Sequence, residues 1–369
     1  MPRIEVSLRS NPYFVTVCSE AEKKLITSLK RQVKKNRLFV IYDANFYALH
    51  GINLKNILSN EFDVSEIIIP SGEKTKSEQE LNKIMSFLLT NRISRSDFIL
   101  AVGGGVTSDI VGYAAASVLR GVKWGVVSTT LLGMVDASIG GKTGINHKTG
   151  KNLIGAFWQP SFVHCDINYL NTLPEREMLC GFGEVLKYGG LIGKKMLSMI
   201  ESYLKQPNLY DHKLLLKLTA ESVRYKAHIV KADERESGKR MFLNFGHTVG
   251  HAIENSLGYG KLRHGEAVIL GLITAVDISM IKQKSSSNAL RLYRDLLVKS
   301  VSNLPILKLN KDKINNALNF DKKRIDSKQK FVLLERLGKP YITDKVNKSE
   351  YEYGLDNMIS EYRTGVKRG

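Results

Sequence analysis

Apolar residues in the first half of the chain occur in short runs rich in β-branched side chains, separated by longer amphipathic stretches. The runs cover residues 38–42, 66–70, 98–102 and 124–128. Residues 76–90, between two of these runs, have the spacing of an amphipathic helix. Because strands that alternate with helices are typical of β-α-β units, we expect a mostly parallel sheet that binds ligands at the carboxyl ends of its strands.

Helical periodicity replaces the strand pattern from about residue 175 onward. It covers residues 181–202, 213–231, 245–256 and 266–284. Residues 305–349 are rich in lysine and irregular, which indicates surface helix and loop, and we expect disorder after Tyr362.

Two domains follow from this change of pattern. A chain of 369 residues is longer than one hydrophobic core usually serves. We predict an α/β nucleotide-binding domain over residues 1–174 and a mostly α-helical domain over residues 175–369, with the boundary near the turn that ends at Pro174. The cleft between two such domains is the expected active site.

Composition and charge narrow the class of protein. The chain is 43% hydrophobic and 25% charged, as in ordinary globular proteins. Its apolar run over residues 267–280 is interrupted by Asp277, its start has no apolar signal core, and its three cysteines are scattered. We therefore expect a cytoplasmic protein without a membrane span or a disulfide framework. The net charge is +19 with lysines spread along the whole chain, which favours a solvated basic surface over nucleic-acid binding.

The strongest local signal is a strand that runs into three glycines and then into a helix. Gly103, Gly104 and Gly105 follow the apolar run 98–102 and precede Asp109. Residues without a Cβ let phosphates approach the backbone, and a helix N-terminus favours negative charge. The pattern departs from the G-x-G-x-x-G fingerprint, so an ordinary tight turn remains the alternative to a nucleotide loop.

A second glycine-rich stretch covers residues 136–152. It places Lys142, Lys151 and Asn152 among flexible glycines, which suits a loop around an anionic, polyhydroxylated ligand. A solvated lysine loop is the alternative reading.

Histidines and a carboxylate with helical spacing provide candidate metal ligands. His247 and His251 are one helical turn apart on the same face, and His264 follows in the sequence His-Gly-Glu. Glu184 and Lys187 are three residues apart on a glycine-flanked apolar helix, which favours burial over an ordinary surface pair. A nucleotide loop together with a His/Glu set suggests metal-assisted redox chemistry.

Taken together, these stretches closely resemble the 3-dehydroquinate synthase family of sugar-phosphate cyclases. The resemblance extends from about Leu38 to Leu334. It is carried by motifs at residues 71–76, 103–109, 136–152, 184–187, 226–227, 233–234, 244–254 and 264–266. It implies an N-terminal Rossmann-like parallel-sheet domain followed by an all-α C-terminal domain.

The resemblance also implies an activity. Family members use NAD and one divalent metal, zinc or cobalt, to convert 3-deoxy-D-arabino-heptulosonate 7-phosphate into 3-dehydroquinate and phosphate, the second step of the shikimate pathway. The reaction proceeds by transient oxidation with NAD, phosphate elimination, re-reduction and intramolecular aldol closure. The expected partners are this small sugar phosphate and, as a homodimer, a second copy of the chain, with no nucleic acid and no membrane.

Carried over position by position, the resemblance implies three groups of site residues. Glu184, His247 and His264 are the implied metal ligands. The implied cofactor shell comprises Asp43, Asn45, Glu73, Lys76, Gly103, Gly104, Gly105, Asp109, Thr129, Thr130, Asp136, Lys142 and Lys151. The implied catalytic and substrate residues are Arg120, Lys142, Asn152, Lys187, Lys226, Arg240, Asn244, His251 and one of Lys322 and Lys323.

Within the last group, the resemblance implies that His251 relays the proton of the oxidised hydroxyl, with Lys187 beside it. So many cations suit a phosphate plus a carboxylate. The competing readings are another NAD- and metal-dependent sugar-phosphate cyclase, a glycerol dehydrogenase-like alcohol dehydrogenase, and a basic nucleic-acid-binding or scaffold protein.

Overall fold

A computed structural model describes the chain except for residues 1, 9–10, 20–21, 35, 207–209, 259, 284–286, 326–328 and 368–369 and the side chains of residues 319–325. The chain forms two compact units. Unit 1 comprises residues 1–174 and 215–235, and unit 2 comprises residues 175–214 and 236–369. Residues 215–235, which the sequence placed in the second domain, thus belong to unit 1 by their contacts.

Unit 1 is built on a seven-stranded sheet with the strand order β1-β2-β9-β6-β5-β3-β4. Its neighbouring strands are parallel except for the antiparallel pair β1 and β2. The strands are β1 Arg3–Val6, β2 Tyr13–Cys18, β3 Arg37–Asp43, β4 Asp63–Ile69, β5 Phe98–Gly103, β6 Lys123–Ser128 and β9 Phe162–Asp166. The four predicted runs coincide with β3, β4, β5 and β6, which confirms the parallel sheet.

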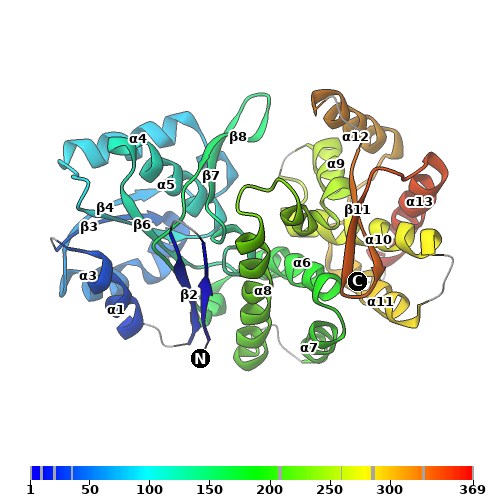
Figure 1. The fold of residues 1–369 in the computed structure, drawn as a ribbon, viewed down its shortest axis with the longest axis horizontal. Coiled ribbons are helices and arrows are strands. Elements are labelled where there is room, and N and C mark those ends of the chain that lie inside the picture. Colours follow the sequence, from blue (N-terminus) through cyan, green and yellow to red (C-terminus); the bar gives the residue numbers. More distant parts are fainter. Residues whose placement is uncertain are drawn as a thin grey trace. The chain divides into compact units, whose positions relative to one another are not determined.

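Helices cover both faces of this sheet, because β3 and β5 are apolar on both sides (Figure 1). On one face, Leu38 and Leu100 belong to a hydrophobic core that includes residues of α1 and α3. On the other face, the ring of Phe39 lies 6.1 Å from the ring of Phe87 in α4. The helices of unit 1 are α1 Glu22–Gln32, α2 Ala44–Phe46, α3 Ile52–Ser59, α4 Glu78–Thr90, α5 Gly105–Ser117 and most of α8 His212–Ala232.

An antiparallel hairpin of β7 Lys142–His147 and β8 Gly150–Phe157 completes unit 1. The sequence predicted only a loop here. Glycines at 144 and 155 face each other across the hairpin, and a Cβ on Gly155 would lie 2.1 Å from the carbonyl oxygen of Thr143. The close backbone approach explains glycine in a strand, where it usually signals a loop.

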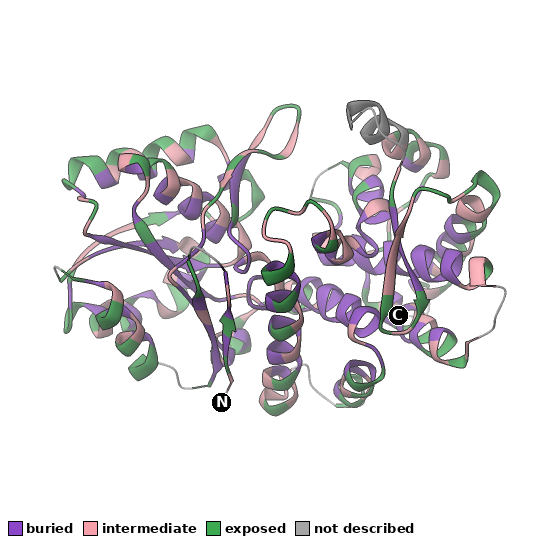
Figure 2. Ribbon diagram, viewed as in Figure 1, coloured by how far each residue is buried: buried purple, intermediate pink, exposed green. Residues whose placement is uncertain are grey.

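Unit 2 is mostly helical, as predicted. Its helices are α6 Glu175–Ile192, α7 Lys194–Leu204, α9 His247–Leu257, α10 His264–Gln283, α11 Asn288–Ser300, α12 Lys311–Ile325 and α13 Lys348–Gly365. The predicted helical stretch 181–202 is divided at Gly193, which has φ 99° and lies between α6 and α7. Figure 2 shows burial concentrated along α6 and α10.

Two predictions about the C-terminal region were wrong. Residues 331–343 form the hairpin β10 Phe331–Arg336 and β11 Lys339–Thr343, so unit 2 is not entirely α-helical. The chain after Tyr362 continues α13 to Gly365, and Tyr362 is buried. In both places buried apolar side chains, among them Phe331, Leu334 and Tyr362, complete the core around α10.

α10 is apolar on all sides because it is the central helix of unit 2. By length and hydropathy alone it could span a membrane, but 83% of its most apolar window is buried. That burial is typical of a core helix.

Candidate metal centre and cofactor-binding residues

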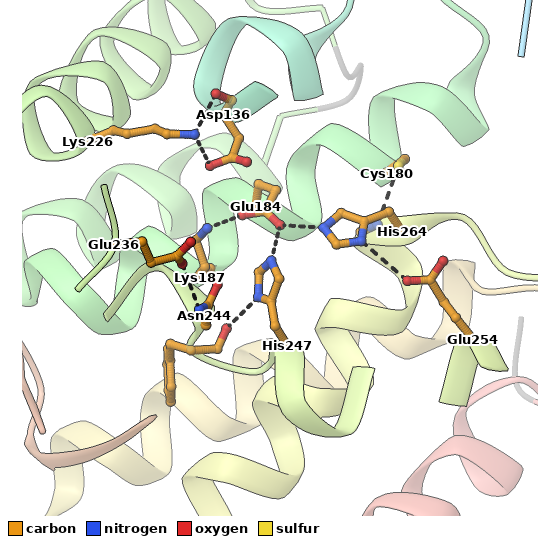
Figure 3. A network of polar contacts seen from close by, with 12 residues as sticks. Asp136, Cys180, Glu184, Lys187, Lys226, Glu236, Asn244, His247, Glu254 and His264 are labelled. Carbon is orange, nitrogen blue, oxygen red and sulfur yellow. Dashed lines mark hydrogen bonds and ion pairs between the residues drawn. The ribbon is translucent and has the colours of Figure 1, made fainter. Parts of the chain in front are cut away.

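Three candidate ligands from three helices converge in unit 2. Glu184 lies in α6, whereas His247 and His264 are the first residues of α9 and α10. The Nε2 atoms of His247 and His264 lie 3.3 and 3.1 Å from Oε1 of Glu184. Figure 3 shows both rings directed at this carboxylate. One carboxylate and two imidazoles form a donor set that zinc uses in catalytic sites.

Glycines bring these helices together, and each candidate ligand has one as a chain neighbour. A Cβ on Gly265 would lie 1.7 Å from the carbonyl oxygen of Cys180, so α6 and α10 touch through their backbones. A Cβ on Gly271 would lie 1.9 Å from the carbonyl oxygen of Gly246, so α9 and α10 meet in the same way. Close backbone contact beside the ligands allows three short side chains to meet at one point.

The electrostatics of the cluster favour an ionised carboxylate. Burial would raise the pKa of Glu184, but the Lys187 ammonium and His247 hold it well below its usual range. Burial would lower the pKa of His264, but hydrogen bonds to Glu184 and Glu254 outweigh it and raise the pKa to about 10. The ionised Glu184 thus attracts positive charge from the groups around it, and a bound cation could replace the charge that His264 presents to it.

His251 lies next to this cluster, one helical turn after His247 on α9. Its ring centroid is 5.3 Å from that of His247 and 5.7 Å from that of His264. One ring nitrogen of each of the three histidines lies within 4.8 Å of the others. His251 is exposed, so it is placed to meet a molecule bound beside the cluster.

Other predicted residues of unit 2 surround Glu184. Lys187 forms an ion pair with Glu184, and its side chain is 1% exposed. Arg240 is also buried. Asn244 donates from Nδ2 to Oε1 of Glu236 at 3.0 Å. Glu236 was not predicted, because an acidic residue shortly before Arg240 is its only signal in the sequence. Its φ of 62° shows that the backbone here adopts an unusual conformation.

The predicted cofactor residues of unit 1 gather at the carboxyl ends of three neighbouring strands. Asp43 ends β3, Gly103 ends β5, and Thr129 follows β6. The amide of Thr129 donates to the carbonyl of Gly103 at 3.0 Å. Oδ1 of Asp43 accepts from the amide of Asn45 at 3.0 Å and from the hydroxyl of Ser71 at 2.8 Å. The sheet therefore brings together residues that are far apart in the sequence.

The three-glycine turn has two structural roles here. A Cβ on Gly104 would lie 2.8 Å from Cγ2 of Thr130, and one on Gly105 would lie 2.8 Å from Cβ of Ala137. The glycines thus permit close packing of the strand end. They also leave the N-terminus of α5 without a side-chain cap, so its first amides are available to an anion.

A polar cluster joins the segment after β4 to α5 and to the β7–β8 hairpin. Nζ of Lys76 donates to Oδ2 of Asp109 at 2.6 Å and also to Oδ1 of Asn152. Glu73 accepts from Nδ2 of Asn146 at 2.8 Å. Burial raises the pKa of Asp109, against the lowering effect of Lys76. Four predicted site residues, Glu73, Lys76, Asp109 and Asn152, therefore belong to one polar network. Asn146 also belongs to it, although the sequence did not single it out as a site residue.

The remaining predicted residues are placed separately. Nζ of Lys226, from α8, donates to the carbonyl oxygen and to Oδ1 of Asp136 at 2.6 and 2.7 Å (Figure 3). Lys142 is exposed at the start of β7, and Lys151 lies half-buried on β8. Arg120 is exposed with φ 62° and has no ion pair within the described part of the chain. The side chains of Lys322 and Lys323 lie outside the described residues.

Comparison with known sequences identifies relatives over nearly the whole chain. Residues 66–180 match the family described as 3-dehydroquinate synthase N-terminal, and residues 181–324 match 3-dehydroquinate synthase C-terminal. The 3-dehydroquinate synthase of Vesicomyosocius okutanii is 37% identical over 97% of this chain and 98% of its own length. That of Nitrosospira multiformis is 44% identical over 74% of this chain and 75% of its own length.

Solved structures share the fold. A 2-deoxy-scyllo-inosose synthase complexed with carbaglucose-6-phosphate, NAD+ and Co2+ has a TM-score of 0.84 and 23% identity, covering 96% of this chain and 100% of its own. The 2-epi-5-epi-valiolone synthase of Streptomyces hygroscopicus, with NAD+ and Zn2+ bound, has a TM-score of 0.81 and 24% identity, covering 96% and 98%. A glycerol dehydrogenase from Schizosaccharomyces pombe has a TM-score of 0.65 and 16% identity, covering 96% and 90%.

Proposed function

The chain belongs to the 3-dehydroquinate synthase family, and we propose that it converts 3-deoxy-D-arabino-heptulosonate 7-phosphate into 3-dehydroquinate and phosphate. The enzyme is then a carbon–oxygen lyase of aromatic amino acid biosynthesis. The observation that carries the proposal is the convergence of His247 and His264 on one oxygen of Glu184, in a chain that matches the family in both halves.

Glu184, His247 and His264 would hold the divalent metal, zinc or cobalt. The fit is supported by their chemistry: the two Nε2 atoms and the carboxylate oxygen are close enough for one cation to replace the present hydrogen bonds. When bound, such a metal acidifies a coordinated substrate hydroxyl. The neighbouring Lys187 balances the carboxylate charge.

Unit 1 would hold NAD at the carboxyl ends of β3, β5 and β6. The uncapped N-terminus of α5 suits the pyrophosphate, and the Asp43 carboxylate suits ribose hydroxyls. When bound, NAD would accept a hydride from the substrate, and the resulting ketone would acidify the proton on the neighbouring carbon. Lys76 and Asp109 would orient the cofactor through the network that they form with Asn152.

The substrate's phosphate and carboxylate would be bound by the predicted cationic and amide residues. Lys187, Lys226 and Arg240 are buried; Lys187 and Lys226 are held by Glu184 and Asp136, and such fixed cations suit an anionic substrate. The exposed Arg120, Lys142 and Asn152 would complete the set. The exposed His251 would take the hydroxyl proton, because its ring lies beside the rings of both candidate histidine ligands.

The proposal includes a cytoplasmic location and a homodimer, with no nucleic acid or membrane as a partner. Both are consistent with a biosynthetic enzyme acting on a small phosphorylated metabolite.

Substrate selection tests the proposal. Purified protein with NAD and zinc or cobalt should release phosphate from 3-deoxy-D-arabino-heptulosonate 7-phosphate, and a chelator should abolish the release. Sedoheptulose 7-phosphate and glucose 6-phosphate lack the carboxylate and should be poor substrates. Faster turnover of either sugar phosphate would assign the chain to another cyclase activity, and reduction of NAD by glycerol with release of NADH would indicate a dehydrogenase.

A further inference from the structure

Each candidate histidine ligand has a hydrogen-bond partner on the nitrogen that faces away from Glu184. Nδ1 of His247 lies 3.2 Å from the carbonyl oxygen of Phe245, a neutral acceptor. Nδ1 of His264 lies 3.3 Å from Oε2 of Glu254, a carboxylate. Figure 3 shows Glu254 and Glu184 on opposite sides of the His264 ring. The two ligands are therefore oriented by acceptors of different charge.

Glu254 reaches His264 from a neighbouring helix. It lies on α9, seven residues after His247, so both side chains project from one face of that helix. Its side chain is 7% exposed. α9 thus supplies one candidate ligand directly and contacts a second candidate ligand through a buried carboxylate.

The backbone of His264 is anchored separately from its ring. Before it lie Gly258 and Gly260, both with positive φ, and the buried Leu262. Glu266 accepts from the amide of Arg263 at 2.7 Å and from Nε of Arg176 at 2.7 Å, which fixes the start of α10. These contacts hold the backbone, whereas the ring is held through its two nitrogens, Nε2 by Glu184 and Nδ1 by Glu254.

We propose that Glu254 is a positioning residue for the metal centre. It accepts the Nδ1 proton of His264, which leaves the Nε2 lone pair for a cation, and it orients the ring so that Nε2 and Oε1 of Glu184 would meet the same cation. The role rests on the proposed function, because it presumes a metal at Glu184, His247 and His264. A carboxylate behind a ligating imidazole orients the ring and increases its donor strength.

The test compares metal affinity in Glu254→Gln with that of the unchanged protein, using Zn2+ in competition with a chromophoric chelator. We expect Zn2+ to bind about 10- to 100-fold more weakly in the variant. The visible absorption of bound Co2+ should also change, since the ligand field depends on the orientation of the ring. Saturating metal should restore much of kcat with KM for the sugar phosphate unchanged.

Glu177→Gln is the matched control. Glu177 pairs with Arg263 next to His264, at 3.0 Å from its Nε, and contributes the same charge to the same region without contacting the ring. Its removal should leave Zn2+ affinity within about twofold. Glu254→Asp serves if the glutamine variant does not fold, because it keeps the charge but is one methylene too short, and it too should weaken Zn2+ binding.

The outcomes separate the two proposals. Equal Zn2+ affinity and an unchanged Co2+ spectrum in folded Glu254→Gln or Glu254→Asp would overturn the positioning role while leaving the proposed function intact. Failure of the unchanged protein to bind Zn2+ or Co2+ would overturn both. Equal weakening in Glu177→Gln would show that general charge, and not the contact with the ring, is responsible.

Discussion

Glu184 and Lys187 form an ion pair one helical turn apart on α6, and their side chains are 0% and 1% exposed. A buried ion pair of this kind contributes little to stability when it is intact, but loss of one partner leaves an uncompensated charge. In this protein Lys187 contacts Oε2 of Glu184, and the other oxygen, Oε1, faces two histidines. The pair therefore holds a negative charge in place where a cation is to bind.

Replacing Lys187 with methionine should destabilise the metal-free protein. We expect the free energy of unfolding to fall by about 3–5 kcal/mol, as for other buried pairs that lose one partner. Added Zn2+ should recover more stability in Lys187→Met than in the unchanged protein, because the metal replaces the missing positive charge. Thermal unfolding with and without Zn2+ measures both effects.

Lys83→Met is the control for that experiment. Lys83 pairs with Glu80 at 2.5 Å with the same spacing, but its side chain is 54% exposed. An exposed pair contributes about 0–1 kcal/mol. A similar loss of stability in both variants would contradict the role of burial.

Close contact between α6 and α10 can be tested with Gly265→Ala. The added Cβ would lie 1.7 Å from a backbone oxygen of α6, so the helices must separate and carry His264 away from Glu184. We expect a cost above the about 1–3 kcal/mol of ordinary overpacking, together with loss of Zn2+ binding. Gly189→Ala, whose Cβ would meet only side-chain atoms at 3.0 Å or more, should be milder. Unchanged Zn2+ affinity in Gly265→Ala would be inconsistent with this account.

The glycine turn after β5 can be tested with Gly104→Ala. The new Cβ would lie 2.8 Å from Cγ2 of Thr130. We expect the turn to shift and NAD to bind about tenfold more weakly, which corresponds to a loss of about 1.4 kcal/mol in binding free energy. Calorimetric titration with NAD measures this change. The second change Thr130→Ser removes that methyl group and should recover part of the affinity. Equal NAD affinity in all variants would show that the turn does not meet the cofactor.

Acid sensitivity of unit 1 should depend on His164. Burial in β9 lowers the pKa of this histidine to about 4, whereas its unfolded pKa is about 6.5. The unfolded chain therefore binds the extra proton first as pH falls, and stability is lost progressively between about pH 6.5 and pH 4. At pH 5 this contribution is about 2 kcal/mol. Urea unfolding at pH 7 and pH 5 should show a smaller difference in His164→Leu, and an identical difference in both proteins would contradict the assignment.

The strands β3, β4, β5 and β6 could be predicted from the sequence, but β1, β2 and β9 could not. β3 and β5 are uninterrupted apolar runs, typical of strands buried on both faces. β9 is equally buried but contains His164, Cys165 and Asp166, so its composition concealed it. The β7–β8 hairpin was missed because glycine and lysine within its strands indicate a loop when tertiary contacts are unknown. The β10–β11 hairpin was missed because it lies in a lysine-rich stretch and has Gly338 and Lys339 at its turn.

The candidate metal centre was predictable for a related reason. His247 and His264 lie in short motifs with glycine beside them, and the structure shows that these glycines form the helix contacts. Glu236 and Glu254 were not predicted, because a single acidic residue on a helix or loop carries no local signal. Only the fold shows that they face Asn244 and His264.

The most direct measurement of the central claim is the balance between phosphate and NADH in one reaction. Purified protein is mixed with excess 3-deoxy-D-arabino-heptulosonate 7-phosphate, Zn2+ and NAD at a concentration below that of the substrate, and both products are followed. The account predicts many phosphates released per NAD with no net NADH, because the hydride returns to the substrate in each turnover. Accumulation of NADH in step with substrate consumption, or no phosphate release with metal and NAD bound, would contradict it.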